Sequence, residues 1–415
     1  MTGPLWGDLP NGWLAGQVKN AATVTLGKML QSRDSGSDAF APYLRAANVQ
    51  PDGVLALDDV NEMWFSDSEM DQLSIRAGDV VVVEGGQGGF GRAAYVDEDL
   101  PGWGFQNSIN RLRPIGNFDG RFISYYLIAL RASGFIRAYS NVVSMPHLTA
   151  EKLARVPMPL PPPSEQRPIA DYLDRETARI DTLIAEQQRL IDLLRERRRA
   201  VIDHSVLIDA ENVTFSRLFS FHNGDRGSAY PSRDEFALGG VPFVNAGHLS
   251  GGAVSYDGMN YVTPEKYRDM GGAKLLPGDI LFCLRGSLGK FGYFDGAGGG
   301  ALASSLVALR CYDQSRIDLR YFLYFLASSS MADAVRLAET GSAQPNLAVE
   351  QLARIALPLP SPEEQRTIAN HLDYQIAKID TLTRESGYLI ELSKERRSAL
   401  ITAAVTGQID AREMA

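Results

Sequence analysis

The chain has 415 residues, of which 45% are hydrophobic and 22% are charged, and its net charge is −9. These values are typical of globular proteins and exclude wholesale disorder, and the length allows two or more domains. Two cysteines are too few for a disulfide framework, no apolar run reaches the ~20 residues of a membrane span, and no signal peptide is evident. We expect a soluble cytoplasmic protein that is not a non-specific nucleic-acid binder, because such binding depends on many basic side chains.

Residues 1–158 are predicted to form a first domain that is rich in short strands. Apolar runs at 79–84 and 92–96 are bounded by glycines, which is typical of strands and tight turns. A helix is predicted over Arg121–Arg131. The loop at 86–91 reads Gly-Gln-Gly-Gly-Phe-Gly and matches a dinucleotide-binding pattern, but a predicted strand follows it where that site needs a helix. We therefore expect a loop between strands and no cofactor.

Residues 159–206 are predicted to form a long helix, which follows a proline-rich connector and is opened by Ser164. Its apolar residues alternate at steps of four and three, which is typical of a helix that pairs with another helix. They are Ile169, Leu173, Ile180, Leu183, Leu190, Leu194 and Val201. A basic cluster, Arg195 and 197–199, recurs as Lys394, Arg396 and Arg397. It indicates a solvated face or, alternatively, a contact with phosphates or with an acidic partner.

Residues 207–357 are predicted to form a second β-rich domain, with a strand at 279–284 and a helix over Arg320–Ala327. Residues 358–415 are predicted to form a second spacer helix, opened by Pro362-Glu363, and a C-terminal tail. The second seam consists of Ile368, Leu372, Ile379, Leu382, Leu389 and Leu400. Both seams are interrupted by polar residues at the same levels, namely Glu176 and Gln187 in the first and Gln375 and Ser386 in the second.

The two halves of the chain are copies of one unit. Between 164 and 204, 21 of 41 residues recur 199 positions later, as Gln166 does at Gln365. The domains before the helices match more weakly, so the helices share a structural role while the domains have diverged. The pattern predicts an α+β fold in which two β-rich domains are joined by two long antiparallel helices, which form a coiled-coil spacer with a pseudo-twofold internal repeat. A coiled coil that serves only dimerisation is the alternative.

Catalytic patterns are not evident. Gly289-Lys290 is not a phosphate-binding loop, because Leu284 stands where that motif needs its first glycine. The five histidines show no metal-ligand spacing, and His147 is replaced by Asn346 in the other copy. We therefore expect no catalytic residue and no metal site in this chain.

The motif P-L-P-x-P-x-E-Q-x-x-I-A-x-x-L-D, followed by A-x-I-D-x-L and E-x-R-R-x-A-x-I, resembles the specificity (S) subunit of type I restriction-modification systems. The resemblance covers nearly all of the chain. It implies two target recognition domains that each read one half of a split double-stranded DNA site, and a helical spacer that docks two modification (methyltransferase) subunits. It also allows a restriction/translocase subunit to join. S-adenosylmethionine, ATP and Mg would bind these partners, and this chain would need no cofactor.

Base readout needs polar side chains on loops that reach a groove. In the first domain the candidate DNA-binding residues are Arg45, Asn48, Gln87, Arg92, Asn107 and His147. In the second domain they are Asn245, His248, Arg285, Ser287, Lys290, Ser304 and Asn346. A structural loop role is the alternative for each of them. For the whole chain, the alternatives are a tandem β-domain scaffold without a DNA role and a self-contained DNA-modifying enzyme with a cryptic site.

Overall fold

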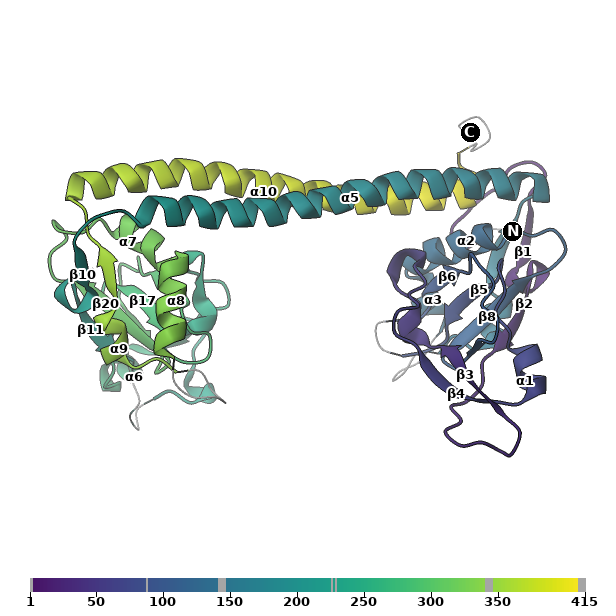
Figure 1. Ribbon diagram of the computed structural model, residues 1–415, viewed down its shortest axis with the longest axis horizontal. Helices are drawn as coiled ribbons and strands as arrows, with labels where there is room; N and C mark the ends of the chain where they lie inside the picture. Colours follow the sequence, from purple (N-terminus) through teal and green to yellow (C-terminus); the bar gives the residue numbers. More distant parts are fainter. Residues whose placement is uncertain are drawn as a thin grey trace. The chain divides into compact units, whose positions relative to one another are not determined.

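A computed structural model describes residues 3–86, 89–140, 147–224, 227, 230–339 and 346–409 (Figure 1). The chain divides into two compact units, which comprise residues 1–187 with 388–415 and residues 188–387. Each unit combines one β-rich domain with one half of each long helix. These helices, α5 (Pro163–Val206) and α10 (Pro362–Val405), are each continuous over 44 residues.

The domain of the first unit contains a four-stranded antiparallel sheet, in the order β2-β8-β5-β6, and a three-stranded sheet, in the order β4-β3-β7. A separate pair, β1 with β9, lies next to the start of α5. In chain order the elements are β1 (Leu14–Gln17), β2 (Ala22–Leu26), β3 (Ala39–Leu44), β4 (Asn61–Phe65), α1 (Asp67–Gln72), β5 (Val80–Val83), β6 (Ala93–Tyr95), β7 (Gly104–Phe105), β8 (Ile109–Pro114), α2 (Gly120–Ala132), α3 (Phe135–Tyr139), α4 (Ala150–Ala154) and β9 (Pro157–Leu160).

The domain of the second unit repeats this plan with a six-stranded sheet, β11-β20-β17-β18-β14-β13, and a four-stranded sheet, β15-β12-β19-β16. Its elements are β10 (Asn212–Thr214), β11 (Phe219–Asn223), β12 (Val241–Val244), β13 (Leu249–Ser250), β14 (Gly252–Val254), β15 (Asn260–Val262), α6 (Pro264–Asp269), β16 (Lys274–Leu275), β17 (Ile280–Cys283), β18 (Phe291–Tyr293), β19 (Gly300–Leu302), β20 (Leu306–Cys311), α7 (Leu319–Leu326), α8 (Ser329–Ala338), α9 (Val349–Arg354) and β21 (Ala356–Pro358).

The central strand of each domain separates two apolar cores. All four valines of β5 are buried, and they alternate between the core beneath α2 and the core shared with β3 and β4. Successive side chains of a strand point to opposite faces, so a strand that is covered on both sides must be apolar throughout. The four residues of β17 alternate in the same way. The predicted strands and the helices near residues 121 and 320 are therefore confirmed, and strand β6 follows the glycine-rich loop.

A buried glutamine joins each domain to its long helix. The side-chain oxygen of Gln166 accepts a hydrogen bond from the Asp119 amide at 2.9 Å, and its amide group donates to the Pro161 carbonyl at 2.8 Å. Gln365 makes the equivalent bonds to Asp318 and Pro360, both at 2.8 Å. Both side chains are fully buried. The glutamine of the repeated motif is thus explained, because a buried amide needs partners for both of its ends.

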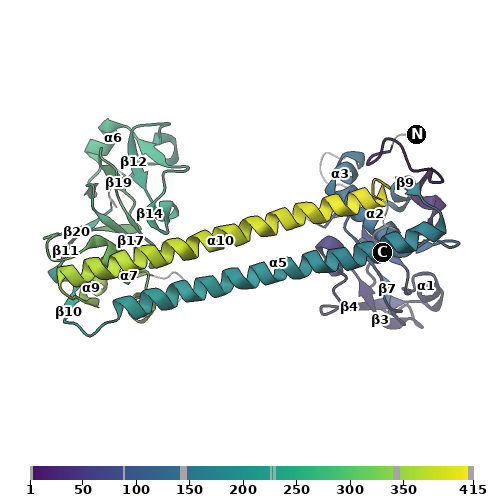
Figure 2. The same ribbon diagram turned by 90° about the horizontal axis from the view of Figure 1, so that it is seen from above.

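The helices pack together in each unit, and both views show them side by side (Figures 1 and 2). The predicted seam is wrong in the middle of each helix. Leu183 and Leu190 are 41% and 39% exposed, while Ile180 and Ile191 are buried. The buried isoleucines are eleven residues apart, and the same spacing recurs in α10. The positions of a seven-residue repeat drift around a straight helix by about 20° per heptad. An eleven-residue spacing over three turns is closer to the period of a straight helix, so it keeps these isoleucines on the buried face.

One ion pair between the helices occurs in each unit. In the first unit Arg397 Nε lies 3.0 Å from Asp181 Oδ1, and in the second Arg198 Nε lies 3.5 Å from Asp380 Oδ1. Arg397 also donates to the carbonyl of Asp52 at 3.1 Å, and only 9% of its side chain is exposed, against 37% for Arg198. The expected solvated face of the basic cluster is therefore wrong for Arg397, which joins α10 to α5 and to the β-rich domain.

Replacement of Arg397 by alanine should lower the free energy of unfolding by about 1–3 kcal/mol, because it removes charge-assisted bonds to two elements. The matched variant Arg198→Ala loses one half-exposed ion pair, and it should cost less than about 1 kcal/mol. Urea denaturation of the full chain, followed by circular dichroism, measures both. Equal costs for the two variants would contradict the distinction between the two ion pairs.

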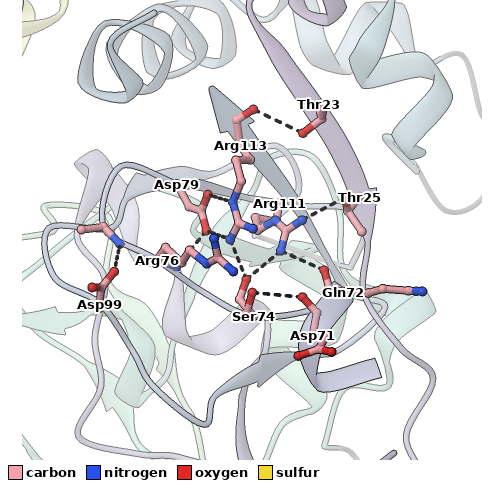
Figure 3. A network of polar contacts seen from close by, with 11 residues as sticks. Thr23, Thr25, Asp71, Gln72, Ser74, Arg76, Asp79, Asp99, Arg111 and Arg113 are labelled. Atoms are coloured by element: carbon pink, nitrogen blue, oxygen red, sulfur yellow. Dashed lines mark hydrogen bonds and ion pairs between the residues drawn. The ribbon is translucent and has the colours of Figure 1, made fainter. Parts of the chain in front are cut away.

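A buried carboxylate and two neighbouring arginines form a polar network in the first domain (Figure 3). Asp79, which is 1% exposed, accepts two hydrogen bonds from Arg113, at 2.8 and 2.7 Å. Arg111 lies beside this pair and donates to the carbonyls of Gln72 and Ser74 at 3.0 and 2.6 Å. Burial, and then the charge of Arg113, lowers the pKa of Arg111 to about 10. The network holds the loop after α1 against the sheet.

Candidate nucleic-acid interface

Four loops of the first domain meet at one edge, where β3 and β5 end and β8 begins. The Ala46 amide donates to Ser108 Oγ at 3.2 Å, and the Glu84 amide donates to the Ser108 carbonyl at 2.8 Å. The Leu148 amide then donates to the Glu84 carbonyl at 2.7 Å. We call the edge formed by residues 45–48, 84–86, 106–108 and 147 the first reading edge. Together with the hydrogen bond from the Gln106 amide to the Leu44 carbonyl at 2.9 Å, these bonds fix its loops relative to one another.

The second domain builds the equivalent edge in the same way. The Ala303 amide donates to the Val244 carbonyl at 2.8 Å, and the Leu284 amide donates to the Ser305 carbonyl at 2.8 Å. The Leu347 amide donates to the Leu284 carbonyl at 2.9 Å. Residues 245–248, 285–287, 303–305 and 346 form this second reading edge. One backbone framework therefore presents two different sets of side chains.

The serine that links three loops of the first edge was missed by sequence reasoning. Ser108 stands one residue before β8, and Ser305 stands one residue before β20. They are 197 positions apart, whereas the repeat has an offset of 199, so their equivalence becomes evident only from the fold. Their role is to position the loops, because the contacts of Ser108 are directed to Ala46, Glu84 and Gln106 of the same edge.

The clearest difference between the two edges is the pair of residues that bridges the second and fourth loops. His147 pairs with Gly85 through the backbone, and its Nδ1 lies 3.4 Å from Glu84 Oε2. In the second domain Asn346 pairs with Arg285, whose Nε donates to Asn346 Oδ1 at 3.1 Å. Arg285 is exposed and His147 is about half exposed. The structure thus brings together two predicted residues of the second domain that are 61 positions apart.

Asn48 and His248 occupy equivalent places and turn inward. The Asn48 side chain donates to the carbonyls of Ala56 and Asp59, at 2.9 and 3.0 Å, and accepts from the Arg45 amide at 2.9 Å. His248 Nδ1 accepts from the Asn245 amide at 3.1 Å, and burial lowers the pKa of its imidazole. Both side chains hold their own loops in this structure. Their contact with bases stays a prediction.

Arg45 and Asn245 begin these two loops. Arg45 Nη2 lies 2.6 Å from Asp59 Oδ2, and about a quarter of its side chain is exposed. Asn245 Oδ1 accepts from the Gly247 amide at 2.8 Å. An ion pair with an exposed carboxylate is weak, so Arg45 can exchange Asp59 for another anion at small cost.

The remaining candidates surround the two edges. Arg92 lies half-buried and donates to the Val49 carbonyl at 3.4 Å, and Asn107 is half-buried at the first edge. In the second domain Ser287 and Lys290 are exposed on the glycine-rich loop after β17, and Ser304 is half-buried. Gln87 lies outside the described residues. Base contact by each of these residues stays a prediction.

The described part of the chain contains no group of three or more histidine, cysteine, aspartate or glutamate side chains that could hold a metal ion. Among the same residues no helix is both long and apolar enough to cross a membrane.

A family model supports the two-copy arrangement. The model for the type I restriction modification DNA specificity domain matches residues 23–192 and again residues 210–389. Each match includes most of one β-rich domain and the first part of the long helix that follows it, with the glutamine joint between them.

Curated relatives include specificity subunits from bacteria and archaea. The specificity subunit of the type I restriction enzyme EcoKI from Escherichia coli strain K12 is 22% identical, and the match covers 98% of this chain and 91% of that protein. The specificity subunit of the type I restriction enzyme MjaVIII from Methanocaldococcus jannaschii is also 22% identical, over 70% of each chain.

Solved structures share the fold. One chain, from a study of the assembly and conformational transition of the type I R-M system, matches with a TM-score of 0.79 and 16% identity, over 97% of this chain and 100% of that one. The HsdS subunit from Thermoanaerobacter tengcongensis matches with a TM-score of 0.57 and 18% identity, over 97% and 99%.

Proposed function

Because the chain belongs to the type I restriction-modification DNA specificity family, whose members are non-catalytic specificity subunits, we propose that each β-rich domain reads one half of a bipartite double-stranded DNA site. The observation that carries this proposal is the pair of reading edges. Both have the same backbone hydrogen bonds but different side chains at equivalent positions. Two readers of this kind suit a site whose halves differ in sequence.

The long helices would set the separation of the two half-sites. Each is an uninterrupted helix of 44 residues, which corresponds to about 66 Å at ~1.5 Å per residue. The buried glutamines attach each domain to the start of the helix that follows it, with no flexible linker between them. A continuous helix is stiff over this length, which favours a fixed spacer in the DNA site.

The helices would also dock two copies of a modification (methyltransferase) subunit. Each unit exposes three leucines on its helix halves, and each of these leucines has a counterpart 199 positions away in the other unit. They are Leu183, Leu389 and Leu392 in the first unit and Leu382, Leu190 and Leu193 in the second. Exposed apolar side chains that recur in this way mark interaction surfaces. Two equivalent surfaces fit two copies of one partner.

The partners would supply what this chain lacks. S-adenosylmethionine, ATP and Mg would bind the modification and restriction/translocase subunits. A net charge of −9 gives this chain little general attraction for DNA phosphates, so we propose that partner subunits provide most of it. The reading edges would then contribute base contacts, which carry sequence information without supplying most of the affinity.

Co-expression of the chain with its modification subunit, followed by methylome sequencing, tests the proposal. We expect one bipartite motif to be methylated. Arg285→Ala should lower methylation at least tenfold, or relax one base of one half-site, because a bidentate arginine contact discriminates between bases by about 1–3 kcal/mol.

Arg336→Ala is the matched control, since Arg336 is an exposed arginine of the same domain that pairs with Asp333 on its own helix. It should leave the motif unchanged. The absence of any methylated motif would overturn the proposed function, and a change in both half-sites in Arg285→Ala would contradict the two-reader model.

A further inference from the structure

A short segment next to the first reading edge has a fixed backbone and exposed apolar side chains. Met29 is 75% exposed and Leu30 is 59% exposed. They follow β2 after Gly27 and Lys28 and belong to no described strand or helix. Two adjacent apolar side chains that face solvent are costly for a protein unless they meet a partner. We call Met29 and Leu30 the apolar ridge.

The backbone on both sides of the apolar ridge is held in place. The Lys28 amide donates to the Phe105 carbonyl at 3.1 Å, and the Lys28 carbonyl accepts from the Asn107 amide at 2.8 Å. On the other side, the Gln31 carbonyl accepts from the Trp64 amide at 3.3 Å. The residue directly before the ridge, Lys28, is therefore hydrogen-bonded to Asn107, a residue of the first reading edge.

Two further features fix the ridge. A Cβ atom at Gly27 would lie 2.2 Å from the Gln106 carbonyl oxygen, so only glycine allows the chain to approach this closely. The Lys28 side chain turns inward, where it forms an ion pair with Glu69 and lies 5.5 Å from the centre of the Phe65 ring. The lysine side chain is therefore held inward, while the two apolar side chains after it are exposed.

The second domain has the same approach but a different sequence after it. A Cβ atom at Gly224 would lie 2.1 Å from the Ala303 carbonyl oxygen, so Gly224 is the counterpart of Gly27. The next residues in the sequence are Asp225-Arg226-Gly227-Ser228, in place of Lys28-Met29-Leu30-Gln31. The apolar pair therefore belongs to the first domain alone.

We propose that Met29 and Leu30 contact thymine methyl groups in the major groove of the half-site that the first domain reads. This inference rests on the proposed function and adds a chemical class of contact to it. The C5-methyl of thymine is the one apolar group on the major-groove edge of a base pair, and apolar side chains recognise it. A rigid apolar ridge beside polar reading loops suits that group, and methionine adapts to its surface.

Deoxyuridine tests the inference on the unmodified protein. It differs from thymidine only by the absent C5-methyl, and it keeps every hydrogen-bonding group of the base. Each thymine of the methylated motif is replaced singly by deoxyuridine in a short duplex, and binding by the complex of this chain with its modification subunit is measured. We expect binding to weaken three- to tenfold at one or two positions of the first half-site.

The variant Met29→Ser/Leu30→Ser should bind the thymine duplex as weakly as the original chain binds the deoxyuridine duplex, and it should no longer distinguish the two. Ile115→Ser is the matched control, because Ile115 is an exposed apolar residue at the opposite end of β8 from the reading edge. The control should keep full sensitivity to deoxyuridine.

The outcomes separate the inference from the proposed function. A complex without any sequence preference for DNA would overturn both. A complex that prefers its motif but binds all deoxyuridine duplexes as well as thymine duplexes would overturn the inference alone. So would a double variant that loses its modification subunit in size-exclusion chromatography, because the apolar ridge would then be a protein-docking surface.

Discussion

Replacement of Asp79 by alanine is expected to lower the free energy of unfolding of the first unit by roughly 3–5 kcal/mol, the range for breaking a buried ion pair. Asp79 is almost fully buried and accepts two hydrogen bonds from Arg113 (Figure 3). Its removal leaves the Arg113 guanidinium without its carboxylate partner. Arg113 then lies beside Arg111, whose charged form is already disfavoured by burial. Two neighbouring positive charges in a poorly hydrated place repel each other strongly.

The second domain offers a matched control. Asp279 accepts two hydrogen bonds from Arg310, both at 2.8 Å, but Ala308 stands where the first domain has Arg111. Asp279→Ala should therefore cost about 1–3 kcal/mol, as the loss of charge-assisted hydrogen bonds alone does. Adding Arg111→Ala to Asp79→Ala should bring the cost in the first domain towards that smaller value.

The positions of the tryptophans allow the two units to be measured separately. All four tryptophans, Trp6, Trp13, Trp64 and Trp103, belong to the first unit. Tryptophan fluorescence during urea denaturation thus reports the first unit, and circular dichroism reports both. Asp79→Ala should move the fluorescence transition, while Asp279→Ala should move only the dichroism transition. Equal costs for Asp79→Ala and Asp279→Ala would show that Arg111 contributes nothing to the difference.

Insertion of seven residues into both long helices, after Arg189 and after Tyr388, should lengthen the spacer of the methylated motif by about three base pairs. Seven residues add about 10.5 Å to a helix, and base pairs are about 3.4 Å apart. A heptad also turns a helix by nearly two whole turns, so the buried faces stay aligned. Methylome sequencing of the co-expressed complex measures the spacer.

Insertion of the heptad into α5 alone is the control, because it mismatches the two helices and should abolish methylation. The half-site sequences should not change in the double insertion, since neither reading edge is touched. An unchanged spacer in the double insertion would exclude the helices as the element that sets the separation.

Much of the fold could be predicted from the sequence because it depends on repetition and periodicity. The strands β5 and β17 lie where apolar runs between glycines indicated, and the helices α2 and α7 lie where the sequence analysis placed them. The predicted seam was wrong at Leu183 and Leu190, because a small angular drift per heptad accumulates along 44 residues. This drift is not evident from the sequence alone.

The candidate site was less predictable, because the type of a polar residue in a loop does not reveal whether its side chain turns inward or outward. Asn48 and His248 were as good candidates as Arg285 until their hydrogen bonds placed them inside their loops. The apolar ridge escaped a search for polar readers altogether. Its signal in the sequence was Gly27, whose close approach to Gln106 becomes evident only from the fold.

The first unit is assembled from the beginning and the end of the chain. Ile401, Ala404 and Val405 of α10 share one core with Trp13 and Leu173, and Gly407 lies against Pro10 and Trp13. The second unit, in contrast, is one continuous stretch, residues 188–387. On a ribosome the second unit is therefore complete in sequence before the first one is. The domain that is synthesised first must wait, with part of its apolar core uncovered, for the last helix to emerge, and the usual order of folding along a nascent chain is reversed.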